Sequence, residues 1–156
     1  KRFLMPWGEY TPYLTEWASR LFGFRWKDVT YQMKPGHGEG VYETGIGRVS
    51  VMTCSELLSP ALARRSGRAG AEIIIFSSSE AVLRGSKRLG AQNLAMGQMT
   101  AAMLHTPVVY AANKGRSFAL DSHGEIIWQS EGLGEEVAIV EVALTSGKSV
   151  AAYLLP

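Results

Sequence analysis

A single cysteine, Cys54, stands where the apolar run "VSVMT" gives way to a helix-like run, and the acidic Glu56 follows two positions later. A tight turn from a strand into a helix exposes a side chain and brings unbonded backbone N–H groups close to it. A thiol placed there can act as a nucleophile, and the N–H groups can stabilise the oxyanion that forms. Free cysteines are also among the most often buried residue types. These residues alone therefore leave open whether Cys54 is a nucleophile or a structural thiol, and whether Glu56 is more than an acid at a helix start.

A second group of reactive residue types lies in the opening stretch "KRFLMPWGEYTPY". Lys1 and Glu9 are eight positions apart in a segment rich in proline, glycine and aromatic residues, which predicts a loop. Lys1 could be simply solvated, and Glu9 could bond only the N–H groups of its own loop. The aromatic residues Trp7, Tyr10 and Tyr13 could shape an apolar entrance, although loop packing is the commoner use of such a cluster.

The elements that must position these residues follow from periodicity and turn residues. A helix is expected after Thr11 as N-cap and Pro12 as first helical residue, and a second helix from Glu56 to Arg68. The other expected elements are two short strands within residues 41–54, strands at 71–78 and 107–113, a helix over 87–104, a hairpin at 115–130 and a last strand at 135–144. This order predicts an α/β domain with a mixed sheet and helices on one face.

Composition narrows the class of protein. The chain has 156 residues, of which 46% are hydrophobic and 19% charged, as in a soluble globular domain. The net charge of +2 gives no reason to expect nucleic acid as a partner, and one cysteine excludes an internal disulfide. No apolar run reaches the roughly 20 residues that span a bilayer, and no signal peptide is recognisable. His37, His105 and His123 have no metal-ligand spacing, so no metal is expected.

Three blocks resemble the nitrilase, or carbon–nitrogen hydrolase, superfamily. "VMTCSELLSPALARRSGRAGAEIIIFSSS" resembles its nucleophile segment, and "VVYAANKGRSFALDSHGEII" resembles the block that follows. The opening stretch is similar to the lysine segment of one branch, the apolipoprotein N-acyltransferases. The positions that fit this segment in register are Lys1, Leu4, Pro6, Trp7, Gly8, Glu9, Tyr10 and Pro12.

The resemblance implies an αββα sandwich and a Glu–Lys–Cys triad that works without a metal or organic cofactor. Cys54 would be the nucleophile, Lys1 the cation that stabilises the oxyanion, and Glu9 and Glu56 supporting carboxylates. Trp7 and Ser55 would contact substrate. The implied reaction moves an acyl chain from a phospholipid, through a thioester, to the N-terminal amine of an apolipoprotein. The implied location is the extracytoplasmic side of a bacterial plasma membrane.

The chain also departs from the family pattern. It starts at the motif's lysine, so residues 1–156 are interpreted as a partial carbon–nitrogen hydrolase domain that lacks its N-terminal part, the triad Glu and any membrane segments, and that is inactive or nearly so by itself. Ser55 replaces a commonly aromatic residue, and "SSSEAV" and "TAAM" replace an Asn-Asp-x-Trp-like loop and an Arg-Ala-x-Glu helix motif. Two alternatives remain: a soluble amidase that hydrolyses a C–N bond, and a non-catalytic interaction domain.

Overall fold

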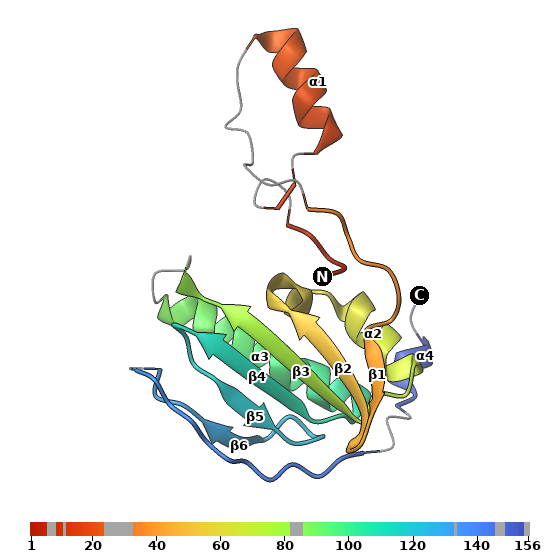
Figure 1. The fold of residues 1–156 in the computed structure, drawn as a ribbon, viewed down its shortest axis with the longest axis vertical. Helices are drawn as coiled ribbons and strands as arrows, with labels where there is room; N and C mark the ends of the chain where they lie inside the picture. Colours follow the sequence, from red (N-terminus) through yellow and green to blue (C-terminus); the bar gives the residue numbers. More distant parts are fainter. Residues whose placement is uncertain are drawn as a thin grey trace. The chain divides into compact units, whose positions relative to one another are not determined.

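The computed structural model describes residues 1–5, 9–10, 12–23, 33–81, 86–132, 134–145 and 149–154. They form two compact units, Lys1–His37 and Gly38–Pro156, and each unit is described here by itself (Figure 1).

The first unit contains one helix, α1 (Tyr13–Phe22), which ends at Gly23 in the left-handed conformation with φ 70°. Pro12, expected as the first helical residue, instead occupies the N-cap position, with ψ 140°. An extended ψ is what an N-cap needs, and the fixed φ of proline is compatible with both positions. Thr11, the expected cap, lies outside the described residues.

The second unit is built on one six-stranded sheet whose strands follow each other in chain order. Strands β2, β3 and β4 are parallel, whereas β1, β5 and β6 are each antiparallel to their neighbour. The strands are β1 (Val41–Thr44), β2 (Gly47–Thr53), β3 (Ile73–Ser79), β4 (Val108–Asn113), β5 (Phe118–Leu120) and β6 (Ile126–Gln129).

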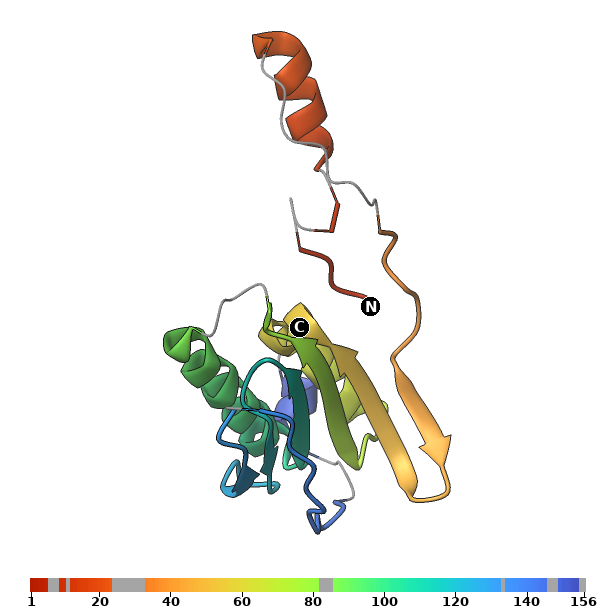
Figure 2. The same ribbon diagram turned by 60° about the vertical axis from the view of Figure 1, so that its left-hand side comes forward.

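The helices of this unit lie on one face of the sheet, as the sequence predicted (Figure 2). They are α2 (Pro60–Arg68), α3 (Lys87–Leu104) and the short α4 (Ala151–Leu154), preceded by the 3-10 helix η1 (Cys54–Leu58). Helices α2 and α3 form the two crossovers between parallel strands. Because such crossovers are right-handed and the strands advance in one direction across the sheet, both helices reach the same face.

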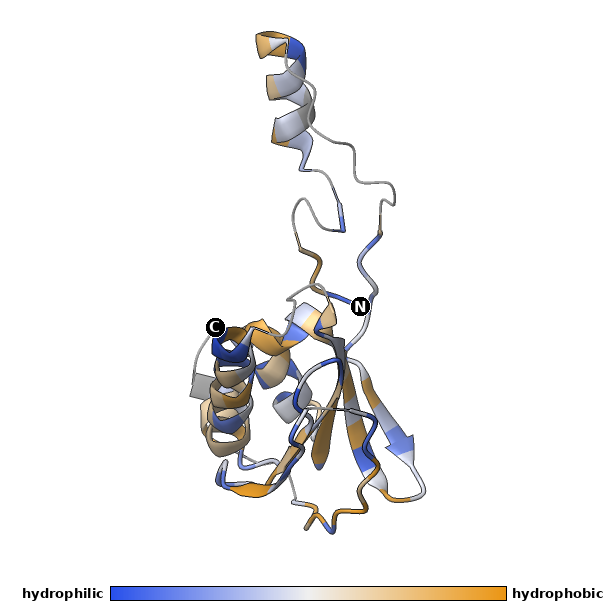
Figure 3. Ribbon diagram, turned by 90° about the vertical axis from the view of Figure 1, so that its left-hand side faces the viewer, coloured by the Kyte–Doolittle hydropathy of each residue, from blue (hydrophilic) through white to orange (hydrophobic). Residues whose placement is uncertain are grey.

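A row of buried side chains crosses four strands beneath the helices. Strand register aligns Met52 with Phe76, Phe76 with Tyr110, and Tyr110 with Phe118. None of the four side chains is more than 2% exposed. Tyr110 stacks on Phe118, with ring centroids 4.6 Å apart. The centre of the sheet carries the hydrophobic colours of Figure 3, as expected for parallel strands that form a core.

Two further sequence-based predictions about elements were wrong. The expected helix from Glu56 to Arg68 is divided, because η1 ends at Leu58 and α2 begins anew at Pro60, with Ser59 as its N-cap. Proline lacks the N–H that a continuous helix needs and suits the first position of a new one. The expected strand at 135–144 pairs with no described strand, and the side chains of Val137 and Ile139 are fully exposed.

Among the described residues, no helix combines the length and the apolar character required to cross a membrane.

The packing of α3 on the sheet can be tested with two glycines of the same helix. A Cβ on Gly97 would lie 2.8 Å from the Phe118 ring, whereas a Cβ on Gly90 would meet nothing within 4 Å. We expect Gly97→Ala to lower the free energy of unfolding by about 1–3 kcal/mol through overpacking. Gly90→Ala should raise it by about 0.5–1 kcal/mol, since alanine favours helix. Urea unfolding measures both, and equal effects would contradict this packing.

Candidate active site

Cys54 stands at the junction of β2 and η1 in a conformation unusual for its type. Its φ is 54°, in the left-handed region, and its side chain is partly exposed. Residues other than glycine rarely adopt this conformation, which costs about 1–3 kcal/mol and concentrates at functional sites. The turn therefore presents the thiol at the strand end, beside the N–H groups that begin η1.

Glu56 holds this turn closed. Its side chain is 2% exposed, and its Oε2 accepts the Thr53 backbone N–H at 2.7 Å. The Thr53 side chain in turn caps the backbone of Glu56, so the two residues form a capping box. The carboxylate two positions after Cys54 is thus built into the turn that carries the thiol.

Ser55 lies between these two residues and is buried, with 8% of its surface exposed. Its hydroxyl is the buried side-chain oxygen that finds no hydrogen-bond partner among the described residues. A buried hydroxyl without a hydrogen bond lowers the stability of a folded protein by about 1–3 kcal/mol. A contribution to stability therefore does not explain why a serine occupies this position.

Lys1 and Glu9, predicted as a functional pair, are in direct contact in the first unit. The Lys1 ammonium donates to Oε1 of Glu9, while the Met5 backbone N–H donates to Oε2 at 2.8 Å. The loop is closed further by the N–H of Gly36, which donates to the Lys1 carbonyl at 2.7 Å. Partial burial raises the pKa of Glu9, but the bonds from Lys1 and Met5 outweigh it and leave the pKa below its usual value.

The predicted residues thus form two groups, one in each unit: Lys1 with Glu9, and Cys54 with Ser55 and Glu56. Trp7 lies outside the described residues.

A further polar cluster, which the sequence analysis did not predict, lies at the ends of β3 and β4. Glu80 is buried, with 5% of its surface exposed. Its Oε1 accepts from the Tyr110 hydroxyl at 2.9 Å and from the Asn93 amide at 2.8 Å. The sequence does contain a pattern that could have predicted the position of Glu80. Phe76, Ser78 and Glu80 are two residues apart, so Glu80 continues the helix-covered face of β3 beyond the end of the strand.

Tyr110 is the buried phenol of this cluster. Burial is the main effect on the pKa of Tyr110 and raises it. A hydrogen bond with Ser78 lowers this pKa, and the bond to Glu80 together with the charges of Glu80 and Cys54 raises it further, so the net shift is upward. The phenol therefore stays protonated and donates to Glu80.

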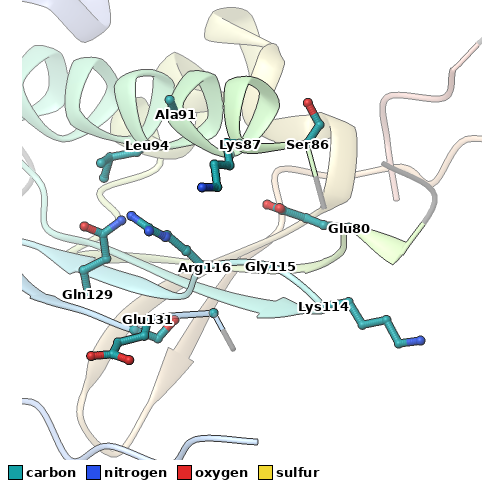
Figure 4. Close-up of a pocket in the computed structure, with 13 residues that line it drawn as sticks. Glu80, Ser86, Lys87, Ala91, Leu94, Lys114, Gly115, Arg116, Gln129 and Glu131 are labelled. Carbon is teal, nitrogen blue, oxygen red and sulfur yellow. The ribbon is translucent and has the colours of Figure 1, made fainter. Parts of the chain in front are cut away.

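Beside the cluster is a pocket of about 700 Å³ (Figure 4). Glu80, Lys87, Arg116 and Gln129 are among its lining residues, and the side chains of Lys87 and Arg116 point into a common space in the close-up. The pocket combines one buried carboxylate with exposed cations, a lining suited to a ligand that has both donor and acceptor groups.

The sequence matches the carbon-nitrogen hydrolase family over residues 5–152. The chain belongs to this family. It is 31% identical over 151 residues to an apolipoprotein N-acyltransferase of Geobacter metallireducens, covering 96% of this chain and 28% of that protein. It is also 31% identical over 130 residues to an apolipoprotein N-acyltransferase of Synechocystis, covering 81% of this chain and 24% of that protein. The carbon-nitrogen hydrolase chain therefore spans about a quarter of the length of these relatives.

Solved structures agree on the fold. A carbon-nitrogen hydrolase from Helicobacter pylori superimposes with a TM-score of 0.61 at 21% identity, over 69% of this chain and 45% of that one. Nit3 of Saccharomyces cerevisiae, a member of branch 10 of the nitrilase superfamily, gives a TM-score of 0.58 at 23% identity, over 69% of this chain and 42% of that one. The predicted family and the α/β class with a mixed sheet are confirmed.

Within the described part of the chain, no three histidine, cysteine, aspartate or glutamate side chains come together as a metal site would require.

The capping role of Glu56 predicts a stability effect. Glu56→Ala removes the acceptor of the Thr53 N–H in a buried turn, so we expect the free energy of unfolding to fall by about 1–3 kcal/mol. Glu136→Ala, at an exposed position outside helices and strands, is the matched control and should have almost no effect. Urea unfolding that gives the same midpoint for Glu56→Ala and the wild type would contradict the assignment.

The Lys1–Glu9 pair predicts a pH dependence. Because the folded pKa of Glu9 is lowered, its stabilising contribution is complete above the unfolded value of about 4.3 and is lost as the pH falls through the folded pKa. An NMR titration that follows the Glu9 carboxyl and the Met5 amide should show this midpoint below the usual value. Lys1→Met should move it upward; a wild-type midpoint at or above the usual value would exclude the pair.

Proposed function

We propose that the protein is an N-acyltransferase of lipoprotein maturation that carries its acyl group on Cys54. The observation that carries the proposal is the strained strand-to-helix turn of Cys54, closed by Glu56, in a chain of the carbon-nitrogen hydrolase family. The names of the two acyltransferase relatives support this choice of reaction.

In the first step, the Cys54 thiolate attacks the acyl ester carbonyl of a phospholipid. The C–S bond forms as the carbonyl oxygen becomes an oxyanion, which backbone N–H groups at the start of η1 and the Lys1 ammonium would stabilise. The C–O bond then breaks, and the lysophospholipid alkoxide leaves with the proton that Cys54 gave up. The enzyme retains the acyl group as a thioester.

In the second step, the N-terminal amine of an apolipoprotein attacks the thioester. An N–C bond forms, the C–S bond breaks, and a proton from the amine passes to the sulfur, so that Cys54 is released as the thiol. Because the first product leaves before the second substrate reacts, the sequence is ping-pong. No step needs a cofactor.

The supporting residues have distinct roles in this proposal. Glu9 orients the Lys1 ammonium, and Glu56 holds the Cys54 turn. Ser55 and Trp7 would contact substrate. The proposal assigns the general base to a carboxylate that is not among the residues named here. The chain spans about a quarter of the length of the two acyltransferase relatives, and we place the base in another part of the protein.

The donor and acceptor suggest a location. A phospholipid donor and a lipid-modified acceptor are both found at a membrane, so we place the whole protein at a bacterial plasma membrane with this domain on the extracytoplasmic side. The membrane segments would belong to other parts of the protein.

The proposal is tested by incubating the full-length protein with a phospholipid labelled in its acyl chain. Mass spectrometry should find the label on the peptide that contains Cys54. Cys54→Ala should carry no label, and transfer should fall by a factor of about 10³ or more, as on loss of a catalytic nucleophile.

Label that persists in Cys54→Ala, or that never appears on the wild type, would refute the acyltransferase. If a wild type without label hydrolysed small amides instead, the amidase alternative would replace it.

A further inference from the structure

Glu80 is a buried carboxylate whose hydrogen-bonding side-chain partners in the described part of the chain are neutral. Its Oε1 accepts from Tyr110 and Asn93, and within the described part of the chain it forms no ion pair. A buried charge without an opposite charge is unfavourable, and a glutamine could accept the same two hydrogen bonds. The negative charge itself is therefore unexplained by the fold.

The position of Glu80 makes the charge available to a ligand. The residue lines the 700 Å³ pocket, and its carboxylate is directed toward the pocket space that the Lys87 side chain also enters (Figure 4). The second oxygen, Oε2, lies close to Gly115, another lining residue of the pocket, where an added Cβ would be only 2.3 Å from it.

The pocket and the nucleophile lie at the same edge of the sheet. Thr53 pairs with Ser77, so Cys54 and Glu80 follow the carboxyl ends of neighbouring parallel strands. In such sheets, ligands bind at this edge. The Tyr110 hydroxyl, on the next parallel strand, donates to Glu80 at this edge.

We propose that this pocket binds the acyl acceptor: Glu80 binds a primary amine as its ammonium, and Lys87 and Arg116 bind the carbonyl oxygens of the peptide that follows. The inference rests on the proposed function, because it assigns the second substrate of the same reaction to a site. A charged hydrogen bond from ammonium to a carboxylate satisfies the buried charge, and the two cations suit a ligand rich in carbonyl acceptors.

The chemistry requires only binding and orientation from Glu80. On conversion to the amide the ammonium loses two protons; one finishes on the sulfur of Cys54 as the C–S bond breaks, and the other passes to water. Glu80 is thus a binding residue for the amine and is not needed for thioester formation.

The two half-reactions separate these roles in the full-length protein. With Glu80→Gln, formation of labelled thioester from phospholipid should stay within twofold of the wild type. The KM for a lipopeptide with a free N-terminal cysteine amine should rise tenfold or more, the loss expected for a charge-assisted bond. Glu136→Gln, which removes an exposed carboxylate outside the pocket lining, should leave both steps unchanged.

A binding measurement tests the pocket independently of catalysis. Calorimetry should show that the full-length Cys54→Ala protein binds the free-amine lipopeptide and binds its N-acetylated form at least tenfold more weakly. The double variant Cys54→Ala/Glu80→Gln should bind the two peptides with equal affinity. If no thioester forms in the wild type but this preference is present, the proposed function fails and the amine site stands. An equal affinity for both peptides, an unchanged KM in Glu80→Gln, or equal losses in both half-reactions would overturn the amine site.

Discussion

The register of the three parallel strands is the constraint on which the rest of the second unit depends. It aligns Met52, Phe76 and Tyr110 in one buried row beneath the helices. A slip of one residue would turn every side chain of a strand to the opposite face, so burial of this row fixes the pairing. The same pairing brings the carboxyl ends of β2, β3 and β4 to one edge, where Cys54 follows β2, Glu80 follows β3 and Asn113 is the last residue of β4.

Local strain at this edge is supported by the rigid core behind it. Cys54 keeps a positive φ while Thr53 and Glu56 satisfy each other's backbone groups. Leu57 follows in the same turn and is part of the core. A strained conformation persists only where its surroundings determine it, and here the capping box and the buried leucine on one side and β2 on the other do so.

The polar groups at the edge are connected by hydrogen bonds that cross between elements. Glu80 bonds Tyr110 of β4 and Asn93 of α3, and its own N–H donates to the Asn113 carbonyl at 2.9 Å. One side chain thus links β3, β4 and α3 at the point where the pocket opens. The segment "SSSEAV", which departs from the family pattern, contributes Glu80, the carboxylate of this cluster. The polar groups at this edge of the sheet therefore differ from those that the family pattern predicts.

The sequence by itself determined the family, the strand–helix order of the second unit and the residues of the two motifs, because periodicity, turn residues and motif spacing are local properties of the chain. Residues 135–144 show the limit of local pattern: they alternate as a strand does, but a strand exists only where a partner accepts its hydrogen bonds, and no described strand does. The helix after Cys54 was divided by Pro60, a local signal outweighed in the prediction by helical spacing. The conformation of Cys54, the burial of Ser55 and the meeting of Glu80 with Tyr110 were decided only by the tertiary structure. Glu80 and Tyr110 are 30 positions apart, and strand pairing, which the sequence does not display, brings their oxygens within 2.9 Å.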